Sequence, residues 1–341
     1  MYPSRISLTT FLPFLAAATS LLSSSALAQP DPSGIDFVTV GAVGNRPYDG
    51  PDINGIMTGR GQVNYEYRLG RTEVTTAQWM EFYNLFADRV PHVNIPFRWG
   101  AFDTGRPTDR FILTSPEAAL YPVSGPTWRT AAMFCNWLHN DKRTDLSAVM
   151  DGAYDVSTFG YEEGTITFTD QPAHHPNARY WIPTTDEWIK AGFYDPNYGG
   201  QGVGGWYYNS PAGSNTQLTY GPPGVGQANS NFDLPNNGHY RIPLGAYPDV
   251  RSPWGCLDMA GGTAEFNETI YRVDNIPYRF VAGSFWTSSA FGSDAIYGIG
   301  AEFPNLPDLF YGLRVAAAIP GPSLPSILFL SALFACRRRR C

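Results

Sequence analysis

The stretch YWIPTTDEW, residues 180–188, combines the end of a strand with the start of a helix. Pro183 ends the apolar run before it, because proline has no N–H group to contribute to a strand ladder. Thr184 and Glu187 have the spacing of a capping box, in which each side chain binds the other residue's backbone N–H. We therefore predict a helix from this point. We expect Trp188 to face the core, the alternative being contact with a ligand.

Two further helices begin with similar signals. Thr75 and Gln78 again have capping-box spacing, and Pro126 and Thr127 precede a second amphipathic segment. In both segments apolar residues recur every three or four positions, so one face of each helix should pack inward. The inward residues are Trp79, Phe82, Tyr83 and Phe86 in the first helix, and Trp128, Ala131, Ala132, Cys135 and Leu138 in the second.

The composition predicts a loop-rich globular domain. The chain of 341 residues is 43% hydrophobic and 16% charged, and it contains 35 Gly and 29 Pro. Such a chain can bury a core but breaks often into turns. We predict one α+β domain over residues 29–316, with little regular secondary structure. Its longest loop runs from about residue 195 to 237, and a loop of that length is usually functional or held by an ion.

Residues 1–28 have the layout of a secretory signal peptide. Arg5 supplies a positive start, an apolar run extends from Phe11 to Leu22, and Ala26 and Ala28 form the small-x-small ending. We predict cleavage before Gln29 and an exported protein. The alternative is a short buried helix.

Residues 317–341 form a second targeting segment. A Pro-rich break precedes an apolar stretch of 13 residues, Leu324 to Cys336, and four arginines follow. The stretch is shorter than the roughly 20 residues of a membrane helix, and the arginines would stay on the cytoplasmic side. The layout resembles PEP-CTERM sorting signals of bacterial envelope proteins, which an exosortase-type protease removes, although Gly321 replaces the glutamate of that signature. The resemblance implies membrane contact before processing, and delivery to the cell envelope or surface.

Charge and cysteine content exclude some functions. Five of the 23 basic residues and none of the 30 acidic ones lie in the two tails, so the mature part carries 18 basic residues and a net charge of about −12. Nucleic acid is therefore excluded as a partner, because phosphate contacts need a positive surface. Cys135 and Cys256 remain in the mature part. They form either one disulfide or two separate buried thiols.

Five stretches in order resemble the formylglycine-generating enzyme family, also called the sulfatase-modifying factor domain. They are YRLGRTEVTTAQW (67–79), YPVSGPTWRTAAMFCNWL (121–138), YWIPTTDEW (180–188), GCLDMAGGTAEF (255–266), and VAGSFW (281–286) with YGLRVA (311–316). The resemblance spans nearly the whole mature chain. It implies a variant of the C-type lectin-like fold.

The resemblance also implies a copper oxidase site, and here the sequence departs from the family. These enzymes oxidise a cysteine of a sulfatase to formylglycine with oxygen and a copper ion held by two cysteines. After the turn formed by Gly283, Ser284 and Phe285, the two cysteine positions fall on Thr287 and Gly292. Cu(I) is a soft ion that selects thiolates, so we expect no copper centre. Ser284 has no base beside it in the sequence and is expected to bond the local backbone.

The sequence leads us to expect a calcium ion but no metal held by a histidine triad. The resemblance implies calcium sites built from carbonyl, amide and carboxylate oxygens, and we predict one bound Ca²⁺. The alternative is that Glu265 caps a turn. No histidine has a helical partner that would complete a metal triad, and His174 and His175 are expected in a solvated turn. The predicted calcium ligands are Glu265, Gly262, Asn229, Ser230 and Asn236.

Aromatic residues gather in the loops near the altered turn, where rings beside polar groups can hold a sugar or an extended peptide. We therefore predict a non-catalytic module that binds a peptide or glycan at the former active-site cleft. One alternative is a formylglycine-generating-type oxidase or a diverged enzyme that acts on a protein substrate through Ser284, Thr287 or Glu265. Another is a structural surface module without a small ligand. The predicted ligand contacts are Phe285, Trp286, Phe291 and Trp206.

Overall fold

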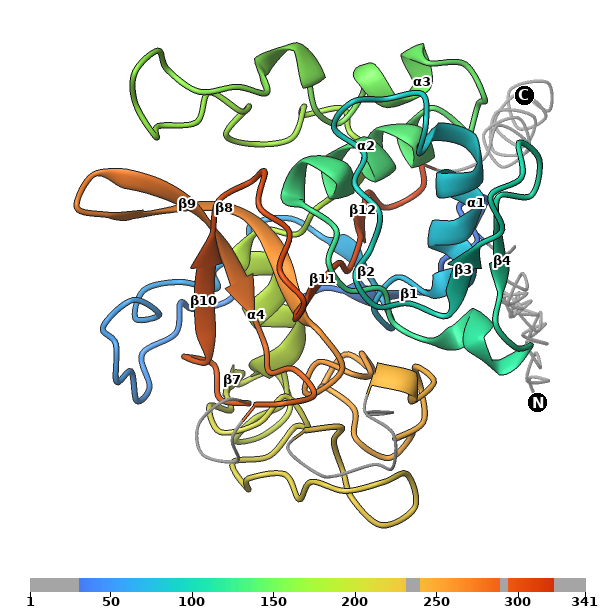
Figure 1. Cartoon of the computed structure of the whole chain (residues 1–341). Helices are drawn as coiled ribbons and strands as arrows, with labels where there is room; N and C mark the ends of the chain where they lie inside the picture. Colours follow the sequence, from blue (N-terminus) through green and yellow to red (C-terminus); the bar gives the residue numbers. More distant parts are fainter. Residues whose placement is uncertain (1–30, 231–239, 289–293, 322–341) are drawn as a thin grey trace, which may run out of the picture. The chain divides into compact units, whose positions relative to one another are not determined.

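The computed structural model describes residues 31–230, 240–288 and 294–321, all of which belong to one compact unit. In these ranges short helices and strands are joined by long irregular loops (Figure 1). The strands form two four-stranded and two two-stranded sheets. The predicted α+β architecture is confirmed. The predicted signal peptide, 1–28, and most of the sorting tail, from residue 322, lie outside the described residues.

The three main helices begin where the capping signals predict. Thr75 and Thr184 each close a complete capping box, and the Thr127 hydroxyl accepts from the Thr130 N–H. The predicted inward faces are buried in all three helices. These helices are α1 (Thr76–Phe86), α2 (Trp128–His139) and α4 (Thr185–Phe193), and the shorter ones are η1 (Glu117–Leu120), α3 (Ser147–Met150) and η2 (Val156–Thr158).

Aromatic contacts join α1 to α2. The rings of Trp79 and Phe134 lie 4.7 Å apart, and those of Phe82 and Trp137 lie 5.7 Å apart. Each of these side chains is at most 1% exposed. Large rings bury much apolar area, so this cluster holds the two helices together without a long regular bundle.

One sheet ties together distant parts of the chain. Its order is β1-β2-β12-β5, and its paired strands are antiparallel. Ala316 of β12 pairs with Leu69 of β2 on one side and with Trp181 of β5 on the other. The strands are β1 (Phe37–Val40), β2 (Tyr67–Gly70), β5 (Tyr180–Trp181) and β12 (Ala316–Ala317).

The other four-stranded sheet, β10-β9-β8-β11, carries the candidate site. Strands β8 and β9 form a long hairpin that projects from the body of the domain, and α4 packs against it (Figure 1). The register shifts between Phe266 and Ile270, and the bulge holds Asn267 and Glu268 inside. The strands are β8 (Ala264–Val273), β9 (Ile276–Ala282), β10 (Ile299–Glu302) and β11 (Tyr311–Gly312).

Two short hairpins complete the described elements. Strands β3 (Ala101–Asp103) and β4 (Phe111–Leu113) pair with each other, as do β6 (Tyr194–Asp195) and β7 (Gly205–Trp206). The β6–β7 pair lies at the start of the predicted long loop, whose described remainder contains isolated bridges such as Asn229 to Gly261. Within the ranges given above, no helix has the length and apolar character needed to cross a membrane.

The cysteine alternatives are resolved in favour of two separate thiols. Cys135 and Cys256 are both buried and free. Burial raises the pKa of each thiol.

Candidate functional site

The altered turn follows β9 and folds tightly on itself. Its Gly283 has a φ of +88°, and a Cβ there would lie 3.3 Å from the Trp188 ring. The Phe285 N–H donates to the Ser288 hydroxyl at 2.8 Å, and the Ser288 N–H donates to the Phe285 carbonyl at 2.8 Å. Position 283 therefore needs glycine, and hydrogen bonds between Phe285 and Ser288 close the turn.

Gly261 and Gly262 bring a second loop, which contains Asn229 and Ser230, against this turn. The Trp286 N–H donates to the Gly262 carbonyl at 3.1 Å, and the Ser230 hydroxyl donates to the Phe285 carbonyl at 3.1 Å. A Cβ on Gly261 would lie 2.5 Å from the Asn229 carbonyl oxygen. Residues 229–230, 261–262 and 284–286 are thus one contiguous backbone cluster.

Ser284 lies inside this cluster and is 1% exposed. Its hydroxyl accepts from the Gly261 N–H at 2.7 Å and donates to the Asp294 carboxylate. The other Asp294 oxygen accepts from the Tyr220 hydroxyl at 2.7 Å. Burial raises the pKa of Asp294. Ser284 was expected to bond the local backbone, but its backbone partner is Gly261, which lies 23 positions earlier in the chain. The carboxylate partner Asp294 was not predicted.

A hollow of about 200 Å³ opens beside the turn, over the sheet that contains β8, β9 and β10. We call it the Phe285 hollow. Among its described lining residues, Ser288 and Tyr311 have polar side chains. Burial, with the charges of Asp308 and Glu302, raises the pKa of Tyr311 to about 12, so its phenol keeps its proton at neutral pH. The lining residues are Ala264, Val281, Gly283, Phe285, Ser288, Gly298, Ile299, Gly300 and Tyr311.

The predicted ligand-binding aromatics do not all reach this hollow. Phe285 lines it and stacks on Phe310, with ring centres 4.4 Å apart and an angle of 23° between the ring planes. Trp286 is 6% exposed and packs against the same Phe310 at 5.4 Å. Phe285 can therefore contact a ligand directly, whereas Trp286 supports the turn from within.

Trp206 is the last residue of β7 and lies in the core. It is 6% exposed, and its ring packs 5.0 Å from Tyr194 and 5.7 Å from Tyr48. Its indole N–H donates to the Arg46 carbonyl at 3.2 Å. The structure thus separates Trp206 from the other predicted ligand contacts. Phe291 lies outside the described residues.

No sulfur atom lines the described part of the hollow. Thr287 is exposed, Gly292 lies outside the described residues, and neither Cys135 nor Cys256 is a lining residue. Both cysteines keep their protons because burial raises their thiol pKa values. A soft metal needs thiolates, so these residues do not fit the copper centre of the family.

Glu265 is committed to an ion pair in the core. Its side chain is 1% exposed, and both oxygens accept from Arg314, at 2.7 Å in the shortest contact. The Trp188 indole N–H donates to the same carboxylate at 2.6 Å. A calcium ion at Glu265 would have to displace a guanidinium, so this carboxylate does not fit a calcium site as it lies here.

The remaining predicted calcium ligands are partly brought together. Asn229, Ser230 and Gly262 are neighbours in the backbone cluster, and Asn236 lies outside the described residues. The described part of the chain holds no group of three or more His, Cys, Asp or Glu side chains placed to bind one metal ion. Calcium binding stays a prediction.

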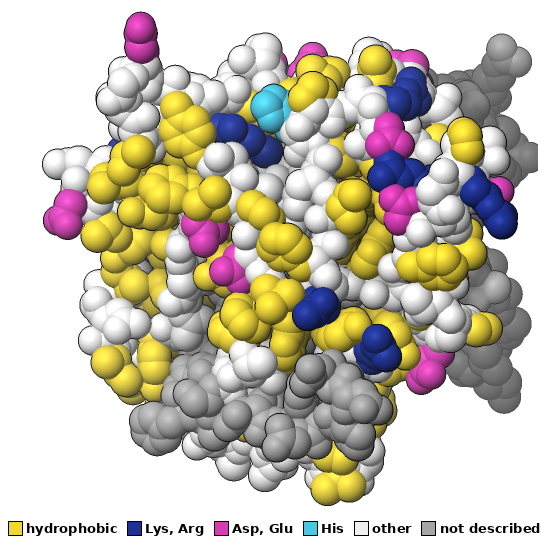
Figure 2. Space-filling model, in the orientation of Figure 1, with side chains coloured by type: hydrophobic (Ala, Val, Ile, Leu, Met, Phe, Trp, Pro, Cys, Tyr) yellow, Lys and Arg dark blue, Asp and Glu magenta, His cyan; other side chains and the backbone are white. Residues whose placement is uncertain are grey.

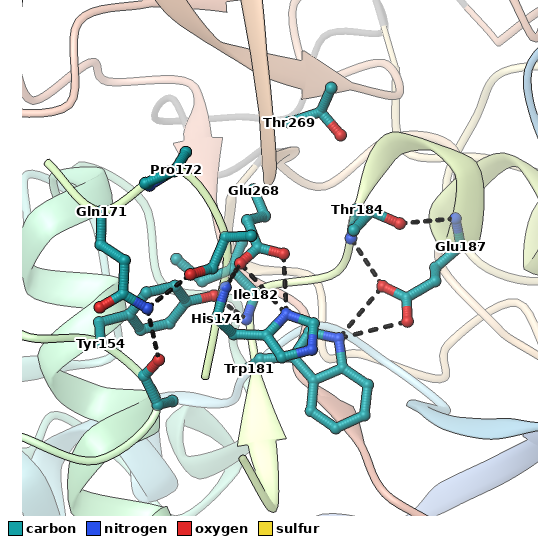
Figure 3. Close-up of polar contacts among 12 residues, drawn as sticks. Tyr154, Gln171, Pro172, His174, Trp181, Ile182, Thr184, Glu187, Glu268 and Thr269 are labelled. Atoms are coloured by element: carbon teal, nitrogen blue, oxygen red, sulfur yellow. Dashed lines mark hydrogen bonds and ion pairs between the residues drawn. The ribbon is translucent and has the colours of Figure 1, made fainter. Parts of the chain in front are cut away.

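Figure 3 shows a second polar cluster, which lies at the bulge of β8. The Glu268 side chain is 2% exposed, and one oxygen lies 2.8 Å from Nδ1 of His174. The imidazole stacks on Trp181 with ring centres 4.5 Å apart, and the Trp181 indole N–H donates to Glu187 at 3.1 Å. The predicted solvated turn is therefore wrong for His174, although His175 is exposed.

Protonation of His174 is coupled to this contact. Burial lowers the pKa of His174, but the hydrogen bond and charge of Glu268 outweigh burial, and the pKa is raised overall. The two residues are 94 positions apart. Glu265 and Glu268 stand among apolar residues in AEFNETIY, residues 264–271, and this was the available sign that buried carboxylates needed partners.

Together the fold and the site define a loop-rich α+β domain in which a tight turn at Gly283 borders a hollow whose described lining residues contain no sulfur. The chain belongs to the family described as sulfatase-modifying factor enzyme 1-like domain, which matches residues 43–319. The match includes the backbone cluster, the Phe285 hollow and the Glu268 cluster. No curated protein matches the chain.

Solved structures with a similar fold have low sequence identity. Treponema denticola variable protein 1 is 17% identical, with a TM-score of 0.52 over 84% of this chain and 95% of that one. The crystal structure of CarF is 17% identical, with a TM-score of 0.49 over 84% and 99%. PvdO from Pseudomonas aeruginosa is 13% identical, with a TM-score of 0.43 over 84% and 92%. At 17% identity the likeness to the Treponema denticola protein concerns the fold alone, and nothing is inferred from the two structures with TM-scores below 0.5.

Proposed function

We propose that this is an exported envelope protein whose domain binds a peptide or a glycan at the Phe285 hollow without turning it over. The supporting observation is the lining itself. Its described residues offer the two aromatic rings of Phe285 and Tyr311 and the two hydroxyls of Ser288 and Tyr311, but no carboxylate, imidazole, amine or thiol. The neighbouring sequence SAFGS, residues 289–293, adds none.

Catalysis of the common kinds needs groups that this lining lacks. General acid–base catalysis needs a group that titrates near the working pH, and a nucleophile needs an adjacent base or a lowered pKa. An aromatic face with a few hydroxyls is instead typical of a site that holds a ligand by stacking and hydrogen bonds. Export is supported by the sequence of the two terminal segments.

A diverged enzyme is the second candidate, and one contact favours it. The Ser284 hydroxyl donates to Asp294, whose pKa is raised by burial. A carboxylate with a raised pKa is a better base than an exposed one. However, Ser284 is 1% exposed, so a substrate could reach it only after the turn opens.

The Gly300→Leu substitution tests the binding proposal by filling the hollow. A Cβ at Gly300 would lie 3.6 Å from the Tyr311 hydroxyl and 3.9 Å from the Val281 Cβ, which are ordinary contacts. We expect the wild-type protein to bind members of a glycan and peptide array, and Gly300→Leu to lose that binding while its thermal unfolding midpoint is kept. Val225→Leu is the control, because Val225 is 80% exposed and does not line the hollow.

Three other outcomes contradict this proposal in distinct ways. A blank array supports the structural module. A chemically changed array peptide supports the diverged enzyme. Stoichiometric copper in the purified protein, together with conversion of a cysteine peptide, supports the oxidase.

A further inference from the structure

We propose that a second hollow binds an acidic saccharide, with the carboxylate of a hexuronate unit held by Arg98 and Arg241. This hollow has a volume of about 270 Å³ and shares no lining residue with the Phe285 hollow. We call it the Arg98 hollow. It is lined by Pro96, Phe97, Arg98, Trp99, Ala101, Thr114, Tyr121, Tyr240 and Arg241.

Two positive charges face one aromatic ring in this hollow. The guanidinium carbon of Arg98 lies 5.6 Å from the centre of the Tyr240 ring, and that of Arg241 lies 5.3 Å from it. The Arg241 Nε–H also donates to the Tyr240 hydroxyl at 3.0 Å. The ring therefore positions both guanidinium groups beside the same open space.

Neither arginine has an ion-pair partner within the described ranges. Other arginines do, such as Arg68 with Asp31 at 2.7 Å and Arg129 with Asp170 at 2.6 Å. Glu117 lies close enough for its charge to act on Tyr121, but it pairs with neither Arg98 nor Arg241. The two exposed guanidinium groups have no ion-pair partner among the described residues, and of their ten N–H donors only the Arg241 Nε–H is given to Tyr240. The remaining donors suit a bidentate carboxylate.

The net charge of the chain does not cancel this local attraction. The formal net charge is −7, which would repel an anion at long range. At physiological ionic strength charges are screened over about 8 Å. An anion inside the hollow therefore interacts mainly with the two arginines that line it.

The aromatic lining favours a sugar ring as the carrier of the anion. Phe97 is 49% exposed, and Trp99 is held in place by Tyr83 at 5.4 Å and Phe111 at 5.3 Å between ring centres. A pyranose ring can lay its C–H face on such rings while its hydroxyls bind the guanidinium groups. Figure 2 shows basic side chains standing among hydrophobic ones on the face it draws.

The backbone beside the hollow favours a saccharide over a peptide. The N–H groups of Phe97 and Arg98 both donate to the Ser124 carbonyl, and the Arg98 carbonyl accepts from the Ser124 N–H at 2.8 Å. The Gly100 N–H donates to the Thr76 hydroxyl at 2.9 Å. A peptide that added as a strand here would need these groups free, so side chains must carry the recognition.

Binding of oligogalacturonate tests this inference, with Trp fluorescence and calorimetry as readouts on the full protein. We expect binding that weakens with salt and weakens at least about tenfold when the carboxylates are methyl-esterified. Arg98→Ala/Arg241→Ala should weaken binding by at least about tenfold as well. Arg272→Ala is the matched control, because Arg272 is exposed at the tip of the β8–β9 hairpin and its side chain binds a carbonyl.

The outcomes separate this inference from the proposed function. Gly300→Leu should leave oligogalacturonate binding unchanged, because it alters the other hollow. The inference is overturned by the absence of binding, by equal affinity for the methyl ester, or by a double variant that binds like the wild type. Tighter binding of a poly-glutamate peptide than of oligogalacturonate would also overturn it, in favour of an acidic peptide.

Discussion

The guanidinium group has opposite roles at two places in this protein. At Arg314 it is buried and paired, whereas at Arg98 and Arg241 it is exposed. The Arg314 side chain is 0% exposed, and Arg98 and Arg241 are exposed at a hollow. Besides Glu265, the Arg314 guanidinium binds the carbonyl oxygens of Gly70, Arg71, Leu257 and Asp258.

The difference shows how surroundings decide the role of an arginine. The Arg314 guanidinium joins residues 70–71, 257–258 and 265, and all its N–H groups donate to them. It therefore stabilises the fold and has no donor left for a ligand. Among the described residues, the guanidinium groups of Arg98 and Arg241 have hydrogen-bond or ring contacts only with Tyr240. Apart from the Arg241 Nε–H, which Tyr240 accepts, their guanidinium donors have no partner among the described residues and can bind a ligand.

The largest expected effect comes from breaking the buried pair. Arg314→Ala should lower the free energy of unfolding by about 3–5 kcal/mol, because it leaves Glu265 buried without its counter-charge. Urea denaturation measures the change. The exposed Arg272→Ala variant should stay within about 0.5 kcal/mol of the wild type. A loss below about 1 kcal/mol in Arg314→Ala would mean that the carboxylate finds water or another donor.

A glycine comparison should give the next largest effect. Gly262 has a φ of +63°, and a Cβ there would lie 2.7 Å from a Glu73 carboxylate oxygen. Gly262→Ala should therefore cost about 2 kcal/mol through backbone strain and this contact. Gly300→Ala, which meets ordinary contacts, is the control and should change stability by less than about 1 kcal/mol. Equal unfolding free energies for the two variants would contradict the tight approach of the backbone cluster.

The His174 contact should make stability depend on pH. Because the pKa of His174 is raised in the folded state, its stabilising contribution is fully present below the unfolded pKa and is lost as pH rises through the folded pKa. The wild type should therefore lose stability relative to His174→Gln as pH rises from the ordinary histidine pKa of about 6.5 through the raised folded-state pKa, since glutamine can donate to Glu268 but does not titrate. Denaturation series at several pH values check this. A constant difference between the two proteins would show that the raised pKa is absent.

The smallest expected effect concerns the exposed pair. Arg98→Ala/Arg241→Ala should shift the free energy of unfolding by no more than about 0.5 kcal/mol, even though it weakens binding of the acidic saccharide. The thermal unfolding midpoint measured beside the binding constant separates these two readouts. A loss of stability comparable with that of Arg314→Ala would contradict this comparison, because it would show that Arg98 and Arg241 also stabilise the fold.

Features that depend on sequence neighbours were predictable. The three helix starts follow from Thr75, Thr127 and Thr184, whose hydroxyls accept from N–H groups three residues further along. The buried faces follow from helical spacing, which requires only one side of each helix to meet the core. The departure from a copper site at Thr287 also follows from the sequence, because side-chain chemistry does not depend on the fold.

Features that depend on distant pairs were not predictable. Trp206 was expected beside the ligand, but β7 places its ring between Tyr48 and Tyr194. Asp294 lies ten positions after Ser284, and the spacing alone does not show that the fold brings its carboxylate to the serine hydroxyl. Aromatic and polar residues in loops carry no periodic signal that would say which way they face.

From the residues alone, the chain specifies its helix starts, its core faces, its family and the lack of sulfur at the turn, because these depend on short-range geometry and on which atoms are present. The fold alone assigns Glu268 to His174, Glu265 to Arg314, and Arg98 and Arg241 to an open hollow. Those assignments depend on burial and charge pairing between segments far apart in the chain, and such interactions exist only once the chain has closed on itself.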